Sequence, residues 1–233
     1  MSPIIENQFF SAAESEELSK RILKLEGSLT RENTLLHFLG YPYYVNALNK
    51  ISRDNEKVKN FNQLMESEFP DVLKKLLLFF QSYLGEDVYL DKTVSYPGFH
   101  AIKIPAKNES MINFHQDTEF KDLSVDRPQF QISGPGPSFT VYLSNDPELE
   151  AGLLYLDGPG FNHERLINPQ NKHERNTKLK LFSHYHPYKT GNIYIHQEVA
   201  HSIFAKNYSD FTKFRLSLQG HLTKTKRGYL LFW

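Results

Sequence analysis

The stretch from residue 192 to residue 222, NIYIHQEVAHSIFAKNYSDFTKFRLSLQGHL, decides the fold class. It contains three short runs rich in Ile, Phe, Leu and Tyr, and polar residues separate each run from the next. In the last run Leu216 and Leu218 alternate with polar residues, which is the period of a strand with one buried face. Runs of this length and composition predict β-strands, here at 192–196, 201–205 and 213–222.

Similar segments recur from Val88 to the end of the chain. They are rich in β-branched and aromatic residues, and turn-forming Gly, Pro, Asn and Asp separate them. Many short strands at such spacing indicate a sandwich, a barrel or a jelly roll. Further strands are expected at 88–96, 99–104, 111–115, 138–143, 152–156, 178–184 and 228–232. Residues 158–190 are polar and irregular for much of their length, which predicts an insertion loop.

The first third of the chain has helical patterns instead. Ser11 and Glu14 have the spacing of a capping box, and the helix that follows is expected to end near Gly27. A second helix is expected within 31–51, and a third from Pro70 to Gly85. The prediction is an α+β fold in a single domain, 1–233, with helical support over 1–87 and a β core over 88–233.

Composition excludes several classes of protein. The chain has 233 residues, of which 39% are hydrophobic and 14% aromatic, so a folded globular protein is expected rather than a disordered one. Lys and Arg number 27, as do Asp and Glu, which argues against a nucleic-acid partner. The absence of cysteine excludes disulfides, thiolate nucleophiles and iron–sulfur clusters. With no apolar run of membrane-spanning length and no signal peptide visible, we expect a soluble, cytoplasmic protein without a membrane partner.

Two short motifs carry the candidate chemistry. His115 and Asp117 are two residues apart on an expected strand, so they project from the same face and offer two ligands for a divalent metal. Such a pair arises by chance about 0.4 times in a chain of this composition, so it gains meaning only with further residues. His201 could supply a third ligand, and Arg215 with Ser217 forms a good receptor for a carboxylate.

The order of these motifs resembles the Fe(II)/2-oxoglutarate-dependent oxygenase superfamily, and within it the prolyl-hydroxylase-like branch. Three further segments, at 96–98, 140–143 and 151–154, resemble strand motifs of that branch, although Ala151 stands where the branch has glycine. The resemblance covers residues 88–222. A departure is the spacing of fourteen positions between His201 and Arg215, which is slightly long for the family.

The resemblance implies a double-stranded β-helix, or jelly roll, with the N-terminal helices packed on its larger sheet. His115, Asp117 and His201 would hold Fe(II), and Arg215 would bind the cosubstrate 2-oxoglutarate. Three other residues would assist with the cosubstrate, namely Ser217, Tyr142 and Tyr96. The implied reaction is that of a dioxygenase, in which O2 and 2-oxoglutarate are consumed, succinate and CO2 are released, and an unactivated C–H bond is hydroxylated. The carboxylate of Asp117 favours hydroxylation over halogenation.

The expected substrate is a small molecule, such as an amino acid or a biosynthetic intermediate. The insertion loop holds more basic than acidic residues, which suggests a lid over an anionic substrate. The alternatives are a prolyl-type hydroxylase of protein side chains and a non-catalytic metal-binding β-helix protein. A cupin-type enzyme without a cosubstrate is a fourth possibility, but it has no need of the receptor at Arg215 and Ser217.

Two other motifs compete for the metal. His196 and Glu198 form a second His-x-carboxylate pair, for which we expect a place in a loop at the mouth of the cavity. His184 and His186 could open a cupin-like site, but the glycine and glutamate expected after them are missing, which favours a polar strand end.

Overall fold

The structure is a computed structural model that describes residues 3–25, 30–31, 36–42, 55–111, 114–156 and 183–233. Its helices are α1 (Ala12–Lys24), α3 (Asn55–Glu68), α4 (Pro70–Leu84) and α5 (Glu119–Asp126), followed by the 3-10 turn η2 (Pro128–Phe130). Its strands are β1 (Ile5–Gln8), β2 (Thr30–Arg31), β3 (Leu36–Leu39), β4 (Val88–Tyr89), β5 (Gly98–Ile104), β6 (Glu109–Met111), β7 (Gly134–Tyr142), β8 (Leu149–Tyr155), β9 (His184–Pro187), β10 (Asn192–His196), β11 (His201–Asn207), β12 (Lys213–Thr225) and β13 (Gly228–Phe232).

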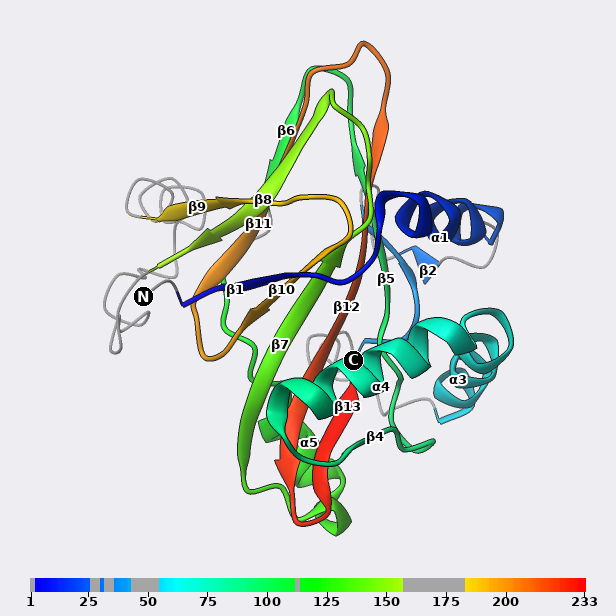
Figure 1. Cartoon of the computed structure of the whole chain (residues 1–233), viewed down its shortest axis with the longest axis vertical. Coiled ribbons are helices and arrows are strands. Elements are labelled where there is room, and N and C mark those ends of the chain that lie inside the picture. The colour runs from blue at the N-terminus through cyan, green and yellow to red at the C-terminus, as the bar shows by residue number, and fades with distance from the viewer. Residues whose placement is uncertain (1–2, 26–29, 32–35, 43–54, 112–113, 157–182) are drawn as a thin grey trace.

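The strand order defines a double-stranded β-helix. The larger sheet contains the order β10-β7-β12-β5, and the smaller sheet has the order β6-β11-β8-β9 (Figure 1). From β5 to β12 the chain passes back and forth between these two sheets, and neighbouring strands within each are antiparallel. Further strands extend the larger sheet: β1 beyond β10, β3 and β2 beyond β5, and β13 with β4 beside β12. The predicted fold class and jelly-roll core are confirmed by this topology.

Successive side chains of a strand point to opposite faces of its sheet, and the apolar ones form two separate clusters. Leu216 and Leu218 of β12 belong to the outer cluster, which lies between the larger sheet and the helices. Ile102 of β5 and Ile203 of β11 belong to the inner cluster, which draws side chains from both sheets. Burying a large aliphatic side chain stabilises a fold by about 1.5–3 kcal/mol, so the two clusters fix which face of each strand turns inward.

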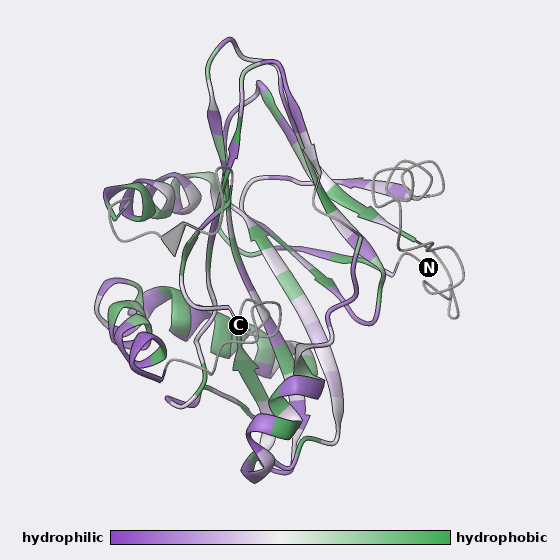
Figure 2. Ribbon diagram, turned by 180° about the vertical axis from the view of Figure 1, so that it is seen from behind, coloured by the Kyte–Doolittle hydropathy of each residue, from purple (hydrophilic) through white to green (hydrophobic). Residues whose placement is uncertain are grey.

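The helices cover the larger sheet as predicted. Buried residues of α1, α3 and α4 share the outer cluster with strand residues, and Figure 1 shows these helices on one side of the molecule. In Figure 2 each helix carries both hydrophobic and hydrophilic segments, as a surface helix should. The capping box at α1 is present, because the Ser11 hydroxyl accepts from the Glu14 amide at 3.2 Å while the Ser11 amide donates to the Glu14 carboxylate at 2.7 Å. Pro70 begins α4, and Gly85 ends it in the left-handed conformation.

The N-terminal segment contains strands that were not predicted. β2 and β3 occupy Thr30–Arg31 and Leu36–Leu39, and most of the rest of the range in which a helix was expected, 32–35 and 43–51, lies outside the described residues. The reason is tertiary pairing, since Leu36–Leu39 forms a full ladder with β5. Residues 1–87 therefore supply three strands as well as helices, and one of those helices, α3, was not predicted.

Several predicted strands have different bounds. The strand expected at 88–96 is only Val88–Tyr89, and the strand expected at 111–115 is described as Glu109–Met111, with 112–113 outside the described residues. The end of the expected insertion, 184–187, is strand β9 of the smaller sheet, whereas 157–182 lies outside the described residues. The predicted lid and most of the strand expected at 178–184 fall in that range. No helix in the described part of the chain combines the length and apolar character needed to cross a membrane.

Candidate active site

A pair of backbone hydrogen bonds brings the first two candidate ligands together. His115 and His201 form an isolated β-bridge, in which each backbone N–H donates to the other residue's carbonyl at 2.9 Å. The two imidazole rings therefore lie side by side, with centroids 4.4 Å apart. His115 was expected inside a strand; the bridge at the beginning of β11 positions it instead.

Asp117 completes a compact group of three. Its Oδ1 lies 3.7 Å from His115 Nε2 and 3.9 Å from His201 Nε2, and the three ligand atoms all lie within 4.8 Å of one another. The Nδ1 of His201 lies 2.9 Å from the Val199 carbonyl, which fixes the proton on Nδ1 and leaves Nε2 free to bind a metal. Two imidazole nitrogens and one carboxylate oxygen are a donor set that suits a divalent transition metal.

The electrostatics of the site favour neutral imidazoles at His201 and His196 beside an ionised Asp117. Burial lowers the pKa of His201 well below its usual value, and burial lowers the pKa of a neighbouring histidine, His196, to about 4. Burial by itself would raise the pKa of Asp117, but the histidines around it, His201 foremost, hold that pKa below its usual range. A metal could therefore bind at neutral pH without first displacing protons from these imidazoles.

Arg215 is the second notable group. Its side chain is wholly buried on β12, where Nη1 donates to Ser217 Oγ at 3.2 Å. The guanidinium lies 5.3 Å from the Tyr188 ring centre and 6.0 Å from that of Tyr142. Among the described residues, Nε and Nη2 make no hydrogen bond of ordinary geometry, and the Tyr188 hydroxyl interacts only loosely with the guanidinium and with Thr140. Burial lowers the pKa of Arg215 as a consequence. The two nitrogens of this buried cation that lack a well-formed hydrogen bond make it a receptor for an anion.

Most of the predicted site residues are brought together, and one is not. His115, Asp117 and His201 form the metal-type group, and Ser217 and Tyr142 lie beside Arg215. Tyr96, in contrast, belongs to the outer cluster on the helical side of the larger sheet, and its hydroxyl donates to Glu66 of α3 at 3.0 Å. Tyr96 is therefore not placed to contact a cosubstrate at Arg215.

Of the residues in the two rival motifs, one lies beside the metal-type group, and two others lie away from it. His196 was expected in a loop, but it ends β10, is buried and has its ring 4.3 Å from that of His201. Glu198 is exposed and has a positive φ of 53°, so it does not join the group. His186 lies 3.1 Å from Glu6 of β1 and is part of a separate polar network.

Sequence reasoning missed His221, which lies beside Asp117, and Ser138, which contacts His221. His221 Nδ1 lies 3.8 Å from Asp117 Oδ2, and 2.9 Å from Ser138 Oγ on β7. The available signal was the alternation of β12, because Arg215, Ser217 and His221 are separated by even numbers of residues. Ser138 gives no comparable signal, since it reaches His221 only through the pairing of β7 with β12.

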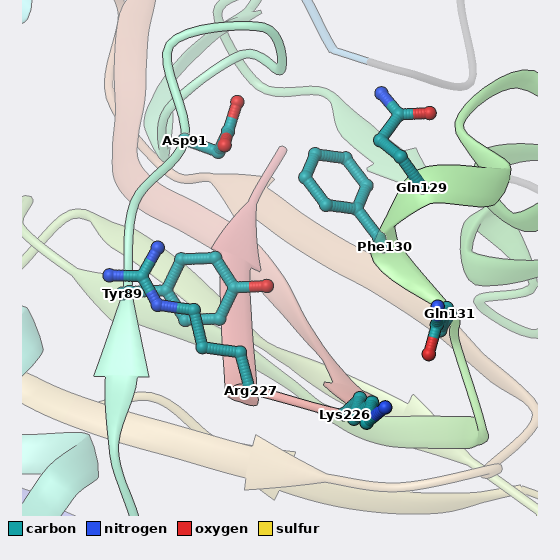
Figure 3. A pocket seen from close by; sticks show the side chains of 7 residues that line it. All are labelled: Tyr89, Asp91, Gln129, Phe130, Gln131, Lys226 and Arg227. Atoms are coloured by element: carbon teal, nitrogen blue, oxygen red, sulfur yellow. The ribbon is translucent and has the colours of Figure 1, made fainter.

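A cavity of about 390 Å³ is lined by none of the candidate metal ligands, and the residues that do line it are drawn in Figure 3. Its wall contains Tyr89, Phe130 and Arg227, with the Arg227 guanidinium 4.5 Å from the centre of the Tyr89 ring. Phe130 packs against an apolar cluster that includes Phe232. The centre of the Phe232 ring lies 5.7 Å from the centre of the His221 ring. The apolar cluster thus stands between this cavity and the histidines.

Neither a family model nor a curated protein matches the sequence. Solved structures that resemble the chain include a prolyl-4-hydroxylase of Pseudomonas putida, with 13% identity, a TM-score of 0.43 and coverage of 96% of this chain and 93% of that one. EctD from S. alaskensis, solved with 2-oxoglutarate and 5-hydroxyectoine, has 15% identity, a TM-score of 0.48 and coverage of 93% and 71%. EvdO2 from Micromonospora carbonacea, complexed with 2-oxoglutarate, has 14% identity, a TM-score of 0.47 and coverage of 96% and 88%. The fold assignment above rests on the strand order of this chain alone.

Proposed function

We propose that this protein is an Fe(II)- and 2-oxoglutarate-dependent dioxygenase that hydroxylates an unactivated C–H bond of a small molecule. The observation that carries the proposal is Arg215, a fully buried cation of which two nitrogens, Nε and Nη2, lack a well-formed hydrogen bond among the described residues. A buried charge without a counterion costs several kcal/mol, so the site favours a ligand that brings a carboxylate. The nearby group of His115, Asp117 and His201 suits Fe(II).

The chain's own residues have separable roles in this proposal. His115, Asp117 and His201 would hold the iron, and the hydrogen bond between His201 Nδ1 and the Val199 carbonyl orients one of these ligands. Arg215 and Ser217 would bind the distal carboxylate of 2-oxoglutarate, with the tyrosines at 142 and 188 as its walls. When bound, iron and 2-oxoglutarate would supply the oxidising chemistry together with O2: one oxygen atom would enter succinate as the cosubstrate loses CO2, and the other would enter the hydroxylated C–H bond. The two sheets exclude water from the inner cluster beside the site.

For the substrate we propose a small molecule such as an amino acid or a biosynthetic intermediate, with a prolyl-type protein hydroxylase as the alternative. A carboxylate ligand on iron supports hydroxylation rather than halogenation. Turnover of 2-oxoglutarate in the presence of free amino acids, compared with proline-containing peptides, separates the two classes of substrate. Stimulation of succinate release by peptides alone would favour the protein hydroxylase.

The cofactor assignment is tested by anaerobic titration of the metal-free protein, first with Fe(II) and then with 2-oxoglutarate. The iron–cosubstrate chelate gives a weak visible charge-transfer band. We expect this band in the wild type, its loss in His115→Ala and its weakening in Arg215→Ala. His186→Gln is the matched control, because His186 also contacts a carboxylate but lies in the Glu6 network.

Succinate release then separates an enzyme from a binding protein. A charge-transfer band without any succinate after oxygen is admitted would favour the non-catalytic alternative. Bound iron with no band at any 2-oxoglutarate concentration would contradict the receptor assigned to Arg215, and with it the proposed function.

A further inference from the structure

The two carboxylate oxygens of Asp117 have different surroundings. Oδ1 faces the imidazoles of His115 and His201, at 3.7 and 3.9 Å from their Nε2 atoms. Oδ2 instead faces His221, whose Nδ1 is 3.8 Å away. Only Oδ1 therefore converges with the two histidine nitrogens, while Oδ2 is turned toward another strand.

His221 is held firmly in this position. It lies on β12 directly opposite Ser138 of β7, and the Ser138 hydroxyl is 2.9 Å from His221 Nδ1. The centres of the His221 and Phe232 rings are 5.7 Å apart, and the His221 side chain is only 14% exposed. An irregularity in the pairing of β12 with β7 follows immediately, between His221 and Thr223. Such bulges commonly set the aim of a side chain beside an active site.

A hydrogen-bond donor that faces Oδ2 affects how the Asp117 carboxylate can bind a metal. A carboxylate can bind a metal through one oxygen or through both, and a hydrogen bond to one oxygen favours binding through the other. The negative charge of Asp117 favours the His221 tautomer with its proton on Nδ1. Ser138 Oγ, 2.9 Å from the same nitrogen, then accepts from this N–H, which is shared between the hydroxyl oxygen and Oδ2 of Asp117. The distance of 3.8 Å is longer than a hydrogen bond, but such contacts often tighten when a site binds its ligands.

We propose that His221, fixed by Ser138, is a positioning residue that holds Oδ2 of Asp117 and leaves Oδ1 alone to bind the metal. This inference rests on the proposed function and extends it. The three ligand residues would then occupy three positions around the metal, and the positions that 2-oxoglutarate needs would stay open. Without His221, Oδ2 would compete with the cosubstrate for one of those positions.

The test compares His221→Asn with His221→Leu. The two side chains are similar in size, but the Asn amide places an N–H donor near the position of Nδ1 and Leu has none. Fe(II) affinity and 2-oxoglutarate affinity are measured separately under anaerobic conditions, the second from the charge-transfer band. We expect His221→Leu to weaken 2-oxoglutarate binding by about 10–100-fold while Fe(II) affinity changes much less, and His221→Asn to recover most of the loss.

Two further variants keep the inference testable if His221→Leu fails to fold. Ser138→Ala removes the hydroxyl that fixes His221, and we expect a smaller loss of 2-oxoglutarate affinity in the same direction. His186→Gln alters a histidine–carboxylate contact away from Asp117 and should leave both affinities unchanged. Thermal unfolding of each metal-free variant reports any general loss of stability.

The possible results are distinct. A parallel loss of Fe(II) and 2-oxoglutarate affinity would assign His221 a merely structural role and overturn the inference, as would wild-type values in both His221 variants. Either result leaves the proposed function intact. A wild-type protein that binds iron but never 2-oxoglutarate would overturn the proposed function itself, and the inference with it.

Discussion

At the scale of single residues, Arg215 is a buried charge that lowers the stability of the folded protein. Its guanidinium is fully buried, and the described residues provide it with one hydroxyl and two aromatic rings but no carboxylate. Replacing buried charges by well-packed apolar side chains is often neutral or stabilising by about 1–4 kcal/mol. A protein that needed only to fold would gain from an apolar residue here, so the arginine is best explained by a ligand.

Arg215→Met tests this explanation through stability. We expect the unliganded variant to be as stable as the wild type or more stable, by up to about 2 kcal/mol in urea unfolding. In the wild type, Fe(II) with 2-oxoglutarate at one hundred times its dissociation constant should add about 2.7 kcal/mol, and this increment should vanish in the variant. A variant that is markedly less stable without ligands would show that the tyrosine rings and Ser217 already compensate the charge.

Residue by residue, the sequence was informative where local alternation sufficed. Arg215 and Ser217 share a face because they are two apart on a strand, and the structure has them hydrogen-bonded. Tyr96 was assigned to the site because residues 96–98 resemble a family motif, but its ring packs on the helical side and its hydroxyl donates to Glu66. No periodicity tells on which side of a sheet an irregular segment places its side chain, so that contact needed the folded structure.

At the scale of elements, β7 contains two glycines with different surroundings. A Cβ added at Gly136 would lie 2.6 Å from the Leu222 carbonyl oxygen on β12, whereas one added at Gly134 would meet nothing within 4 Å. Leu222 lies within the irregular pairing that follows His221. The close approach of the two backbones at Gly136 therefore helps to set the position of His221.

Gly136→Ala and Gly134→Ala form a matched pair on this strand. We expect Gly136→Ala to destabilise the fold by about 1–3 kcal/mol, because backbone atoms of β12 must shift to accommodate the methyl group. Gly134→Ala should stay within about 0.5 kcal/mol of the wild type. Chemical denaturation measures both. Equal effects of the two substitutions would mean that general strand properties, rather than the contact with Leu222, determine the cost.

The capping box of α1 predicts a dependence of stability on pH. The hydrogen bond from Lys75 and those from Ser11 lower the pKa of Glu14 to about 2. A carboxylate with a lowered pKa stabilises the fold above its unfolded-state value, and this contribution is lost as the pH falls from about 4.5 toward 2. Glu14→Gln keeps the acceptor of the capping box but removes the charge.

Because Glu14 is half exposed, we expect Glu14→Gln to be less stable than the wild type by only about 0.3–1 kcal/mol at pH 7. The difference should shrink progressively below pH 4.5 in thermal unfolding experiments. A difference that stayed constant down to pH 2 would show that lost hydrogen-bond geometry, not charge, is responsible.

Element prediction succeeded where local signals were strong. Pro70 and Gly85 delimit α4, and Ser11 with Glu14 starts α1, because caps act within a few residues. It missed the strand at Leu36–Leu39, which forms a ladder with the edge of β5. Strand preference depends on such neighbours, and these are absent from a local window of sequence.

At the scale of the whole molecule, the strand order explains why distant segments meet at one site. His115 and His201 are joined by a bridge, while Arg215 and Ser138 come from adjacent strands of the larger sheet. Many short strands predicted a sandwich, a barrel or a jelly roll, and only the family resemblance in the order of the motifs implied the jelly roll. The cross-strand partners His221 and Ser138 followed only from the register, which alternation within single strands does not determine.

The same register places the single tryptophan near the site. Trp233 is buried, and its ring lies 5.1 Å from that of His100, which pairs with Ser217 across β5 and β12. Gly98 makes room for it, because a Cβ there would lie 2.1 Å from the indole ring. The emission of Trp233 should therefore report events at the metal-type group as well as global unfolding.

Titration with two metals tests this connection. Co(II) has partly filled d orbitals and quenches nearby indole emission, whereas Zn(II), with a filled d shell, does not quench by that route. We expect Co(II) to lower the emission of Trp233 in a saturable manner, and prior addition of Zn(II) to block the effect by occupying the same ligands. His115→Ala should weaken Co(II) binding by at least about tenfold, because one of three ligands is lost. His186→Gln, the histidine paired with Glu6, should titrate like the wild type. Quenching that persists unchanged in His115→Ala would place the bound ion elsewhere, and the group of His115, Asp117 and His201 would then not be the metal site.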